Sequence, residues 1–424
     1  MAAQGQPRLS SPERPLGRYR VIELSGLAPL LVGKTFADLG ADVIKVEPPG
    51  GDQARRLGPL INGRTDADAG LLWTAYGLGK RSVTLDIETA GGRRLLRQLL
   101  GTADVLVEAF PPGKLDAAGV SVPDLQASFP QLVITSLTAF GQQGPYSSYQ
   151  ASDLVLFAMG GYLNMTGSPQ GRPLKPSAPY QTFLHAAMHA TMATLLALRQ
   201  RNKTGRGAHV DQSIRDTGVW MLTHTYQHYD MLKVNLGRQG AARDMGGSAV
   251  RLPSVYPTAD GHIVWLFLTG HVGGPSVDAL VGWMREEGAA PDWMVELDWR
   301  SLDLLSADAE LTEKLHRAFS AFFEGKRKAE LLEWALRHGA MLGPVQTLAD
   351  LACDVQLAAR QAWRTLPFGE EHLRIPGPPI RFSDGSWEPR GGSPSPGAHN
   401  REVYCDELGI AMEDLAWFRQ AGAI

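Results

Sequence analysis

Three segments near the N-terminus alternate between strand and helix patterns within residues 21–52. The apolar run at 21–24 predicts a short buried strand, and residues 27–40 predict a helix that ends at Gly40, a residue type favoured at left-handed C-caps. Residues 41–52, ADVIKVEPPGGD, predict a second strand that prolines and glycines stop. Strand, helix and strand at this spacing form a βαβ unit, whose two strands are parallel. The sequence therefore predicts a parallel sheet.

The same alternation continues along the next part of the chain. Three more strands and one more helix are predicted, at residues 81–87, 89–103, 104–110 and 131–137. Such alternation is typical of a doubly wound α/β layer, whose ligands bind outside the carboxyl ends of the strands. Three loops follow predicted strand ends and form the candidate binding rim, at residues 47–52, 108–114 and 138–146.

Length and a change of pattern predict two domains. The chain has 424 residues, whereas one domain usually has about 100 to 200. From about residue 216 an aromatic helix, and then a hairpin signature around Ala259-Asp260-Gly261, replace the alternation. We expect four parts: a disordered tail at 1–20, a large domain at 21–215, a linker helix with a small α/β domain at 216–340, and a return to the large domain at 341–424. Within the last part, GGSPSPGAHN (391–400) is expected to be a flexible spacer.

Composition and motifs argue against several classes of function. The net charge of −3 provides no basic field for nucleic acid, and no apolar run reaches the roughly 20 residues of a membrane span. Cys353 and Cys405 have no CxxC spacing, which favours a reducing compartment. His224 and His228 lack the third ligand that a zinc site needs. We expect a cytoplasmic protein without a metal, a membrane partner or a nucleic-acid partner.

Residues 177–207, SAPYQTFLHAAMHATMATLLALRQRNKTGRG, predict a loop, a long alanine-rich helix and a basic end broken by glycine. Unpaired N–H groups and the dipole make a helix start suitable for an anion or a reactive carboxylate. This helix start contains Gln181, Thr182, Phe183 and Leu184, and none of them is ionisable. The place best suited to an anion is therefore apolar.

Several ordered blocks carry a family resemblance. They are GADVIKVEPPGGD, GKRSVTLDI, ADVLVEAFPPG, TAFGQQGPY, SDLVLFAMGGYLNMTG and KTGRGAHVDQSI, followed by VYPTADGHIVW, GPVQTLADL and GPPIRFS. In order and spacing they resemble the family III CoA-transferases, which include formyl-CoA:oxalate and carnitine CoA-transferases. The resemblance covers nearly the whole chain after residue 20.

The resemblance implies a fold, an assembly and a chemistry. It implies an interlocked ring-like dimer in which each chain has a Rossmann-like large domain and a smaller α/β domain. It implies coenzyme A and acyl-CoA as substrates, with CoA passing from a donor to a free carboxylate through an aspartyl-CoA thioester. A carboxylate nucleophile divides one difficult acyl exchange into easier covalent steps.

The family aspartate has no counterpart in this sequence. Counting back from KTGRG places it at Phe183, and a phenyl ring cannot attack an acyl carbon. Asp153, in a separate upstream block, is expected to order a strand or loop, and His185 is expected to be a packed residue of the helix. The racemase branch of the family would have its histidine at Ser152 and its aspartate again at Phe183. The resemblance therefore implies no catalytic residue in this chain. Asp153 and His185 are the substitutes to consider if the catalytic groups have been relocated.

Further departures concern the residues that the family uses near CoA. This chain has Leu27 where family members often have a glutamine, and Ala117 where they have an arginine. The family pattern LDLK is LDIE here, so Glu88 replaces its lysine. The family pattern ENFRPG is EAFPPG here, which loses the arginine. Each lost hydrogen bond between a phosphate and a cation removes about 1.5 to 3 kcal/mol. The resemblance thus implies a site that has lost its catalytic activity.

The candidate CoA- and substrate-binding residues follow the predicted strand ends. They are Glu47, Asp52, Arg55, Lys80, Arg81, Phe110 and Lys114. Lys80 and Arg81 could contact phosphates or adenine, or they could cap strands and pair with acidic neighbours. Phe183, with Tyr180 and Met188 nearby, could line a pocket for a hydrophobic acyl group or pack in the core.

Three functions remain open. The first is the non-catalytic subunit of a CoA-transferase that moves CoA from a donor such as succinyl-CoA, together with an aspartate-bearing sister chain, as in two-subunit members of the succinyl-CoA:benzylsuccinate type. The second is a self-sufficient CoA-transferase, acyl-CoA isomerase or racemase, paired with itself and with relocated catalytic groups. The third is a non-enzymatic scaffold or sensor, which a fold alone never excludes.

Overall fold

The computed structural model describes residues 14–60, 68, 70–244, 251–304, 307–368, 371–383 and 391–424. The chain forms two units. The first comprises the residues up to Tyr162, Lys175–Lys233 and Ala359–Ile424, and the second Leu163–Leu174 and Val234–Ala358. The sequence placed the changes of domain at residues 215 and 340, whereas contacts place them at 233 and 358. Residues 1–13 of the predicted tail lie outside the described residues, and Leu16 and Tyr19 are buried.

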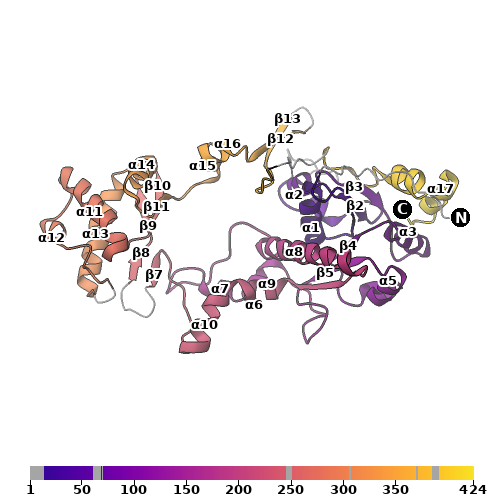
Figure 1. The fold of residues 1–424 in the computed structure, drawn as a ribbon, viewed down its shortest axis with the longest axis horizontal. Coiled ribbons are helices and arrows are strands. Elements are labelled where there is room, and N and C mark those ends of the chain that lie inside the picture. The colour runs from indigo at the N-terminus through magenta and orange to yellow at the C-terminus, as the bar shows by residue number, and fades with distance from the viewer. Residues whose placement is uncertain are drawn as a thin grey trace. The chain divides into compact units, whose positions relative to one another are not determined.

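Six parallel strands form the sheet of the first unit (Figure 1). They are β1 (Arg20–Glu23), β2 (Asp42–Glu47), β3 (Arg81–Thr84), β4 (Val105–Glu108), β5 (Val133–Thr138) and β6 (His209–Ser213). The strand order is β3-β2-β1-β4-β5-β6, and every neighbouring pair is parallel. The predicted doubly wound parallel sheet is confirmed. Its order reverses between β1 and β4, where the strand ends of such sheets leave a crevice for ligands.

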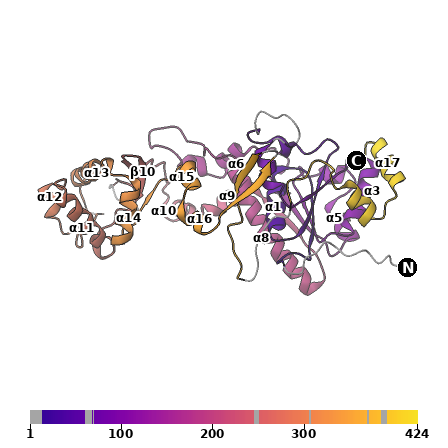
Figure 2. The same cartoon turned by 90° about the horizontal axis from the view of Figure 1, so that it is seen from above.

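Helices cover both faces of this sheet. On one face α1 (Leu27–Asp38) packs beside α8 (Gln181–Thr204), whose buried residues include alanines that permit close approach. On the other face lie α3 (Ala90–Leu100), α5 (Val122–Ser128) and α17 (Met412–Gln420). Figures 1 and 2 both show α3 beside α17, close to the C-terminus. The alanine-rich helix predicted within residues 177–207 is α8, and it ends at Gly205, which has a φ of 71°.

Residues 391–400 cover the edge strand β3. The Ser82 amide donates to His399 Nδ1 (3.1 Å), and the Thr84 amide donates to Asn400 Oδ1 (2.8 Å). The Gly397 amide donates to Ser82 Oγ (2.9 Å). The prediction of a flexible spacer is therefore wrong, because an edge strand carries unpaired backbone groups that this segment satisfies.

The remaining elements of the first unit are short. The helices are η1 (Gln53–Arg56), α2 (Leu71–Tyr76), α4 (Lys114–Ala117), α6 (Asp153–Met159), α9 (Ile214–Met221), α10 (Thr223–Leu232) and the π-helix η3 (Arg401–Glu407). Two strands pair antiparallel, β12 (Trp363–Phe368) and β13 (Glu371–Pro376). Two more helices lie where the chain passes between units, α7 (Tyr162–Met165) and α16 (Val355–Ala359).

The second unit contains an antiparallel sheet of order β11-β10-β9. Its strands are β9 (Val255–Thr258), β10 (Gly261–Trp265) and β11 (Leu342–Pro344), and a separate pair joins β7 (Ala242–Asp244) to β8 (Arg251–Pro253). Thr258 pairs with Gly261, so the predicted hairpin is confirmed. The helices are α11 (Gly270–Glu286), α12 (Asp292–Val295), α13 (Ala309–Glu324), α14 (Lys328–His338) and α15 (Leu348–Ala352). An aromatic core fills this unit, with Trp265 and Phe319 edge to face at 4.7 Å.

Candidate active site

A pocket of about 300 Å³ lies where the strand order of the large sheet reverses. Its walls come from Gly26–Ala28 after β1, Ala109–Pro112 after β4, and Leu137–Ala139 at the end of β5. Phe183, in the first turn of α8, also lines it, as do Ser147, Tyr149, Gln150, Ala151 and Ile214. We call this cavity the helix pocket. The fold thus brings three strand ends and one helix start around a single cavity, as expected for ligand sites of doubly wound sheets.

The helix pocket is poor in groups for acid, base or nucleophilic chemistry. Its polar side chains belong to Thr138, Ser147, Tyr149 and Gln150. Among the described residues that line it, none is an Asp, Glu, His, Lys, Arg or Cys. This arrangement can hold an apolar group, but it offers no carboxylate to accept an acyl group.

Phe183 is half-buried and has two sets of neighbours. It packs against the apolar cluster under α1 and α8, and it also lines the helix pocket. Met188 is more than half exposed and does not line the pocket. Phe183 therefore both packs against the core and lines the pocket.

Asp153 caps the start of α8 from another helix. Tyr180, the N-cap residue, has a φ of 64° and its side chain makes no capping hydrogen bond. Instead Asp153 Oδ1 accepts from the Thr182 amide (3.0 Å) and from Thr182 Oγ1 (2.5 Å). One of the unpaired N–H groups that a helix start offers to an anion is thus satisfied by this chain's own carboxylate. Asp153 orders a helix start, and His185, half-buried on α8, does not line the pocket.

A buried charge cluster stands at the ends of β1 and β2. Lys45 Nζ contacts Glu23 Oε1 (3.1 Å) and Asp52 Oδ2 (2.7 Å), and Lys80 Nζ contacts Glu23 Oε2 (2.6 Å). Burial lowers the pKa of Lys80 to about 8, although Glu23 opposes this shift. Asp52 also accepts from the Gly26 amide at 2.8 Å. These groups neutralise one another and hold loops, which leaves them unavailable to a ligand.

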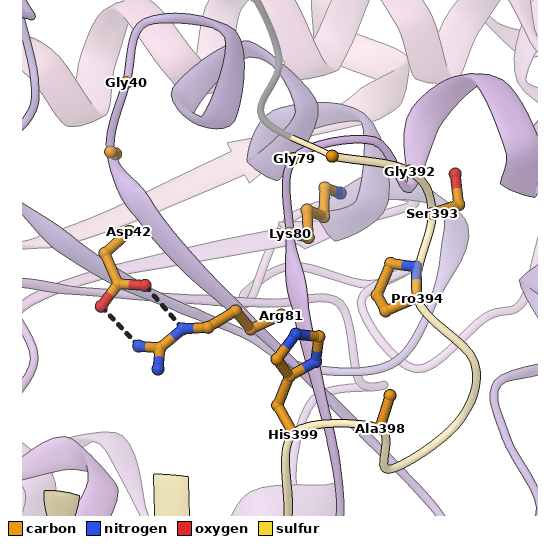
Figure 3. A pocket seen from close by; sticks show the side chains of 12 residues that line it. Gly40, Asp42, Gly79, Lys80, Arg81, Gly392, Ser393, Pro394, Ala398 and His399 are labelled. Atoms are coloured by element: carbon orange, nitrogen blue, oxygen red, sulfur yellow. Dashed lines mark hydrogen bonds and ion pairs between the residues drawn. The ribbon is translucent and has the colours of Figure 1, made fainter. Parts of the chain in front are cut away.

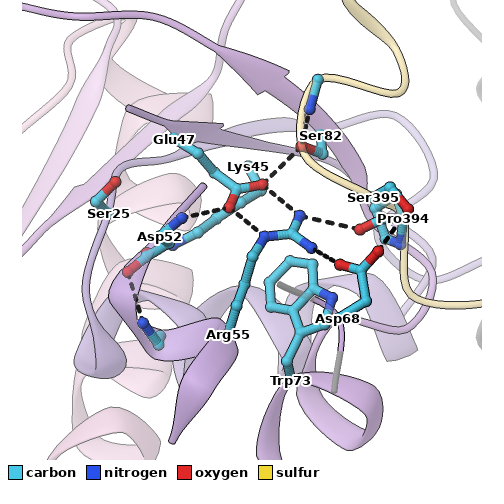
Figure 4. A network of polar contacts seen from close by, with 12 residues as sticks. Ser25, Lys45, Glu47, Asp52, Arg55, Asp68, Trp73, Ser82, Pro394 and Ser395 are labelled. Atoms are coloured by element: carbon cyan, nitrogen blue, oxygen red, sulfur yellow. Dashed lines mark hydrogen bonds and ion pairs between the residues drawn. The ribbon is translucent and has the colours of Figure 1, made fainter. Parts of the chain in front are cut away.

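Arg55 is completely buried and has partners on every side (Figure 4). Its Nε and Nη2 donate to the two Glu47 oxygens at 2.5 and 2.6 Å, and Nη2 also donates to the Pro394 carbonyl at 2.9 Å. Asp68 pairs with Nη1, and the guanidinium lies 3.8 Å from the Trp73 ring centroid. Arg55 and Glu47 therefore join three loops rather than expose charge to the rim.

Arg81 lies at the opposite edge of the sheet from the predicted rim. It is the first residue of β3 and donates to Asp42 at 3.0 and 2.7 Å and to Glu402 at 2.8 Å. Figure 3 shows the Asp42 pair beside His399 in a second pocket, of about 420 Å³. Because β3 begins at Arg81, as the strand predicted at 81–87 does, Arg81 does not share an edge with Phe110 and Lys114. The Lys80 ammonium, in contrast, reaches Glu23 at the end of β1.

Phe110 and Lys114 border a smaller cavity, which we call the rim pocket, of about 170 Å³. It is bounded by residues near or after the carboxyl ends of four strands: Leu24, Ser25, Val46, Pro48, Leu85, Asp86, Ile87, Glu88, Phe110 and Lys114. Phe110 lines both this cavity and the helix pocket. Sequence reasoning did not single out Ser25 or Asp86 as binding residues, although Ser25 lies just beyond one predicted strand and Asp86 lies near the end of another. Pro48 belongs to the predicted rim loop at residues 47–52. The CoA-binding role of Phe110 and Lys114 stays a prediction.

Glu108 supports the loop that carries Phe110. It is buried at the end of β4, where desolvation raises its pKa to about 7 despite a hydrogen bond from Ser136. Its Oε2 accepts from the Phe110 amide at 2.7 Å. Ser136 Oγ also lies 2.9 Å from His209 Nε2. A chain of polar groups therefore runs beneath the loop shared by the two pockets, and the sequence reasoning did not single it out.

Neither a metal site nor a membrane-spanning helix is found in the part of the chain that the structure describes. No group of three or more His, Cys, Asp and Glu side chains there is arranged to hold a metal ion. Within the same residues, no helix has both the length and the hydropathy that crossing a bilayer requires.

The chain resembles known proteins along nearly its whole length. A sequence model of CoA-transferase family III matches residues 16–400. The chain is 32% identical over 412 residues to the BbsE subunit of succinyl-CoA:(R)-benzylsuccinate CoA-transferase from Thauera aromatica, covering 96% of this chain and 97% of that protein. It is 27% identical over 410 residues to the beta subunit of succinyl-CoA–L-malate CoA-transferase from Chloroflexus aurantiacus, covering 95% and 96%. Among solved structures, a CAIB/BAIF family protein from Brucella suis matches with a TM-score of 0.76 and 28% identity, covering 94% of this chain and 99% of that one.

Proposed function

The chain belongs to CoA-transferase family III, whose members move CoA between acyl-CoA and carboxylic acids, and we propose that it is the subunit that does not carry the acyl group. One observation carries this proposal. The helix pocket has Phe183 where the family resemblance expects an aspartate, and no described residue lining it has a carboxylate. A sister chain supplies that carboxylate in the complete enzyme.

The chemistry requires the missing group. In the transfer, a carboxylate oxygen attacks the thioester carbonyl and expels the CoA thiolate, which then attacks the enzyme's own acyl carbon and releases the donor acid. The acceptor carboxylate next attacks this enzyme-bound thioester, and CoA leaves on the acceptor after the mirror-image steps. Phe183 has no oxygen for either bond. Asp153 has two, of which Oδ1 accepts from Thr182 at the start of α8, and Asp153 does not line the helix pocket.

Exposed apolar side chains support a protein partner. Met188, Met192 and Leu196 follow one another at four-residue intervals on α8, and each is more than half exposed. Helix α10 buries none of its ten residues, and a helix this short is marginal in water without packing. We propose that a chain of the same fold covers this face, in the interlocked ring that the family resemblance implies.

The apolar lining of the helix pocket supports a hydrophobic substrate group. Phe183, Phe110 and Tyr149 contribute rings to it. Both subunits to which the chain is similar have succinyl-CoA in the names of their enzymes. We propose succinyl-CoA as the donor, and an acceptor acid whose apolar part is large enough to use such a pocket.

Reconstitution with the partner tests the proposal. The tagged chain is expressed in its native host, and co-purifying chains are identified by mass spectrometry. The partner chain is then produced with and without this chain, and this chain is also produced alone. The proposal predicts CoA transfer by the pair, no transfer by this chain alone, and loss of transfer when the partner's family aspartate becomes alanine. Robust transfer by this chain alone would support the self-sufficient enzyme instead, and inactivity of every combination would support the scaffold.

A further inference from the structure

We propose that Glu88 closes the rim pocket to CoA by occupying Lys114, the one cation among the described residues that line it. This inference deepens the proposed function and rests on it, because CoA that this chain does not bind is held by the sister chain. It assigns the discrimination against CoA to a single side chain, and a binding measurement tests it without any turnover.

The chemistry of CoA sets the requirement. The nucleotide end of CoA carries phosphates, and proteins bind phosphates with charge-assisted hydrogen bonds from Arg, Lys and unpaired backbone N–H groups. An apolar cavity can accept an adenine ring, but it provides nothing for the phosphates beside that ring. Binding of CoA at this edge of the sheet therefore requires free cations in or next to the cavity.

The Glu88–Lys114 pair joins two of the loops that border the rim pocket. Glu88 lies in the loop after β3, and Lys114 is the first residue of α4, after β4. Lys114 Nζ donates to Glu88 Oε1, and this hydrogen bond holds the pKa of Glu88 below its usual value. Glu88 is therefore ionised at neutral pH, and the ammonium that faces the pocket is already occupied.

The charge of the lining disfavours phosphates even when the pair opens. Besides Lys114 and Glu88, the ionisable lining residue is Asp86, so two carboxylates face one ammonium. Asp86 Oδ1 accepts from the Glu88 amide at 2.8 Å, which holds the two acids in one turn. Freeing Lys114 would thus still leave the pocket with a net negative charge.

Neighbouring cations do not replace Lys114. Lys45 and Arg55 are buried and paired with carboxylates. Arg93 lies nearer, but it does not line the pocket, and its Nη1 donates to the carbonyls of Ile87 (3.3 Å) and Glu88 (2.7 Å). It stabilises the loop that carries Glu88 and so helps to hold the acid in place.

The pair is a suitable target because its substitution leaves the fold intact. The side chains of Glu88 and Lys114 are 64% and 42% exposed, and ion pairs this exposed contribute little to stability. A charge reversal there changes the local field without opening a buried group to solvent. Changes in binding can then be read as changes of the pocket rather than of folding.

The experiment measures binding of adenosine 3′,5′-bisphosphate, the nucleotide end of CoA, and of CoA itself to the purified full-length chain by calorimetry at low ionic strength. Wild type is expected to bind both weakly. Glu88→Lys should bind about tenfold tighter or more, and Glu88→Gln should gain less, because it only releases Lys114. The gain of Glu88→Lys should shrink as salt is added, since exposed charges are screened.

The matched control is the exchange of both charges, Glu88→Lys with Lys114→Glu. It keeps the ion pair and the net charge, so it should bind as weakly as wild type. The proposal is overturned if wild type already binds as tightly as Glu88→Lys, if Glu88→Lys folds and gains nothing, or if the exchanged pair gains as much as the single variant. Transfer activity of the isolated chain would contradict the proposed function instead, and this binding assay does not depend on it.

Discussion

The two halves of the sheet's carboxyl edge are built in opposite ways. At the ends of β1 and β2, Glu23, Lys45, Asp52, Glu47 and Arg55 form buried ion pairs that leave no charge for a ligand. Around β4, β5 and the start of α8, the chain forms a cavity whose lining includes no acid or base among the described residues. The buried ionisable residues at the ends of β1 and β2 therefore serve structure, and the lining of the helix pocket has none of them.

The charged half should lose the most stability when one partner is removed. Arg55→Ala leaves Glu47 buried without its cation and removes the contact with Trp73, so the free energy of unfolding should fall by about 3 to 5 kcal/mol. Urea denaturation of the purified chain measures this change. Arg327→Ala, which removes an exposed pair with Asp260, is the control and should change it by less than about 1 kcal/mol. Equal effects of the two substitutions would remove the distinction between the halves.

Glu108 provides a pH-dependent test at the boundary between the halves. Its pKa is raised from 4.5 to about 7, so its folded state keeps a proton that the unfolded state has lost. Its contribution to stability is complete below pH 4.5 and is lost as the pH rises to about 7, by on the order of 3 kcal/mol. Glu108→Gln should match wild type near pH 4 and become the more stable protein above pH 7. Parallel stability curves for the two proteins would contradict the raised pKa.

Asp153 tests whether the helix start in the cavity half depends on a cap. Asp153→Ala removes the acceptor of the Thr182 amide and should lower the free energy of unfolding by about 1 kcal/mol. Asp153→Asn keeps an acceptor oxygen and should lose less. Hydrogen exchange at the first turn of α8 should become faster in the alanine variant, and unchanged exchange would show that the cap is dispensable.

Thr138 is expected to give the smallest effect, and in the opposite direction. Its Oγ1 is buried beside the helix pocket and has no hydrogen-bond partner among the described residues, whereas Thr194 Oγ1 is paired with Thr135 and with the Ala190 carbonyl. Thr138→Val should therefore stabilise the chain by about 1 kcal/mol, and Thr194→Val should destabilise it. A loss of stability in both variants would mean that the Thr138 hydroxyl is satisfied in the folded protein.

The sequence predicted those features that depend on neighbouring residues. The strand at Val43–Val46, the hairpin turn before Gly261 and the end of α8 at Gly205 each follow from a local pattern or a residue with special backbone freedom. The parallel sheet followed because strand and helix alternate along the chain. Local periodicity therefore sufficed for the frame of the large unit.

Features that depend on distant residues were not predictable in this way. Arg55 binds the Pro394 carbonyl 339 positions away, and Arg81 binds Glu402 321 positions away, so each looked like a free rim cation. The cap on α8 joins Thr182 to Asp153 across 29 positions. The sequence identified Phe183 at the helix start, but the apolar cavity around it requires the fold, since its walls come from three strand ends.

Our proposal requires that no side chain of this chain carries the acyl group or CoA. Its most direct test is to incubate the isolated chain with succinyl-CoA, to add hydroxylamine, which converts an enzyme thioester or anhydride to a hydroxamate, and to locate modified acids by mass spectrometry. An aspartate-bearing family member treated in parallel shows that the trap works. We predict no hydroxamate on any aspartate or glutamate of this chain, Asp153 included. A hydroxamate on one acid in an amount approaching one per chain would contradict the account.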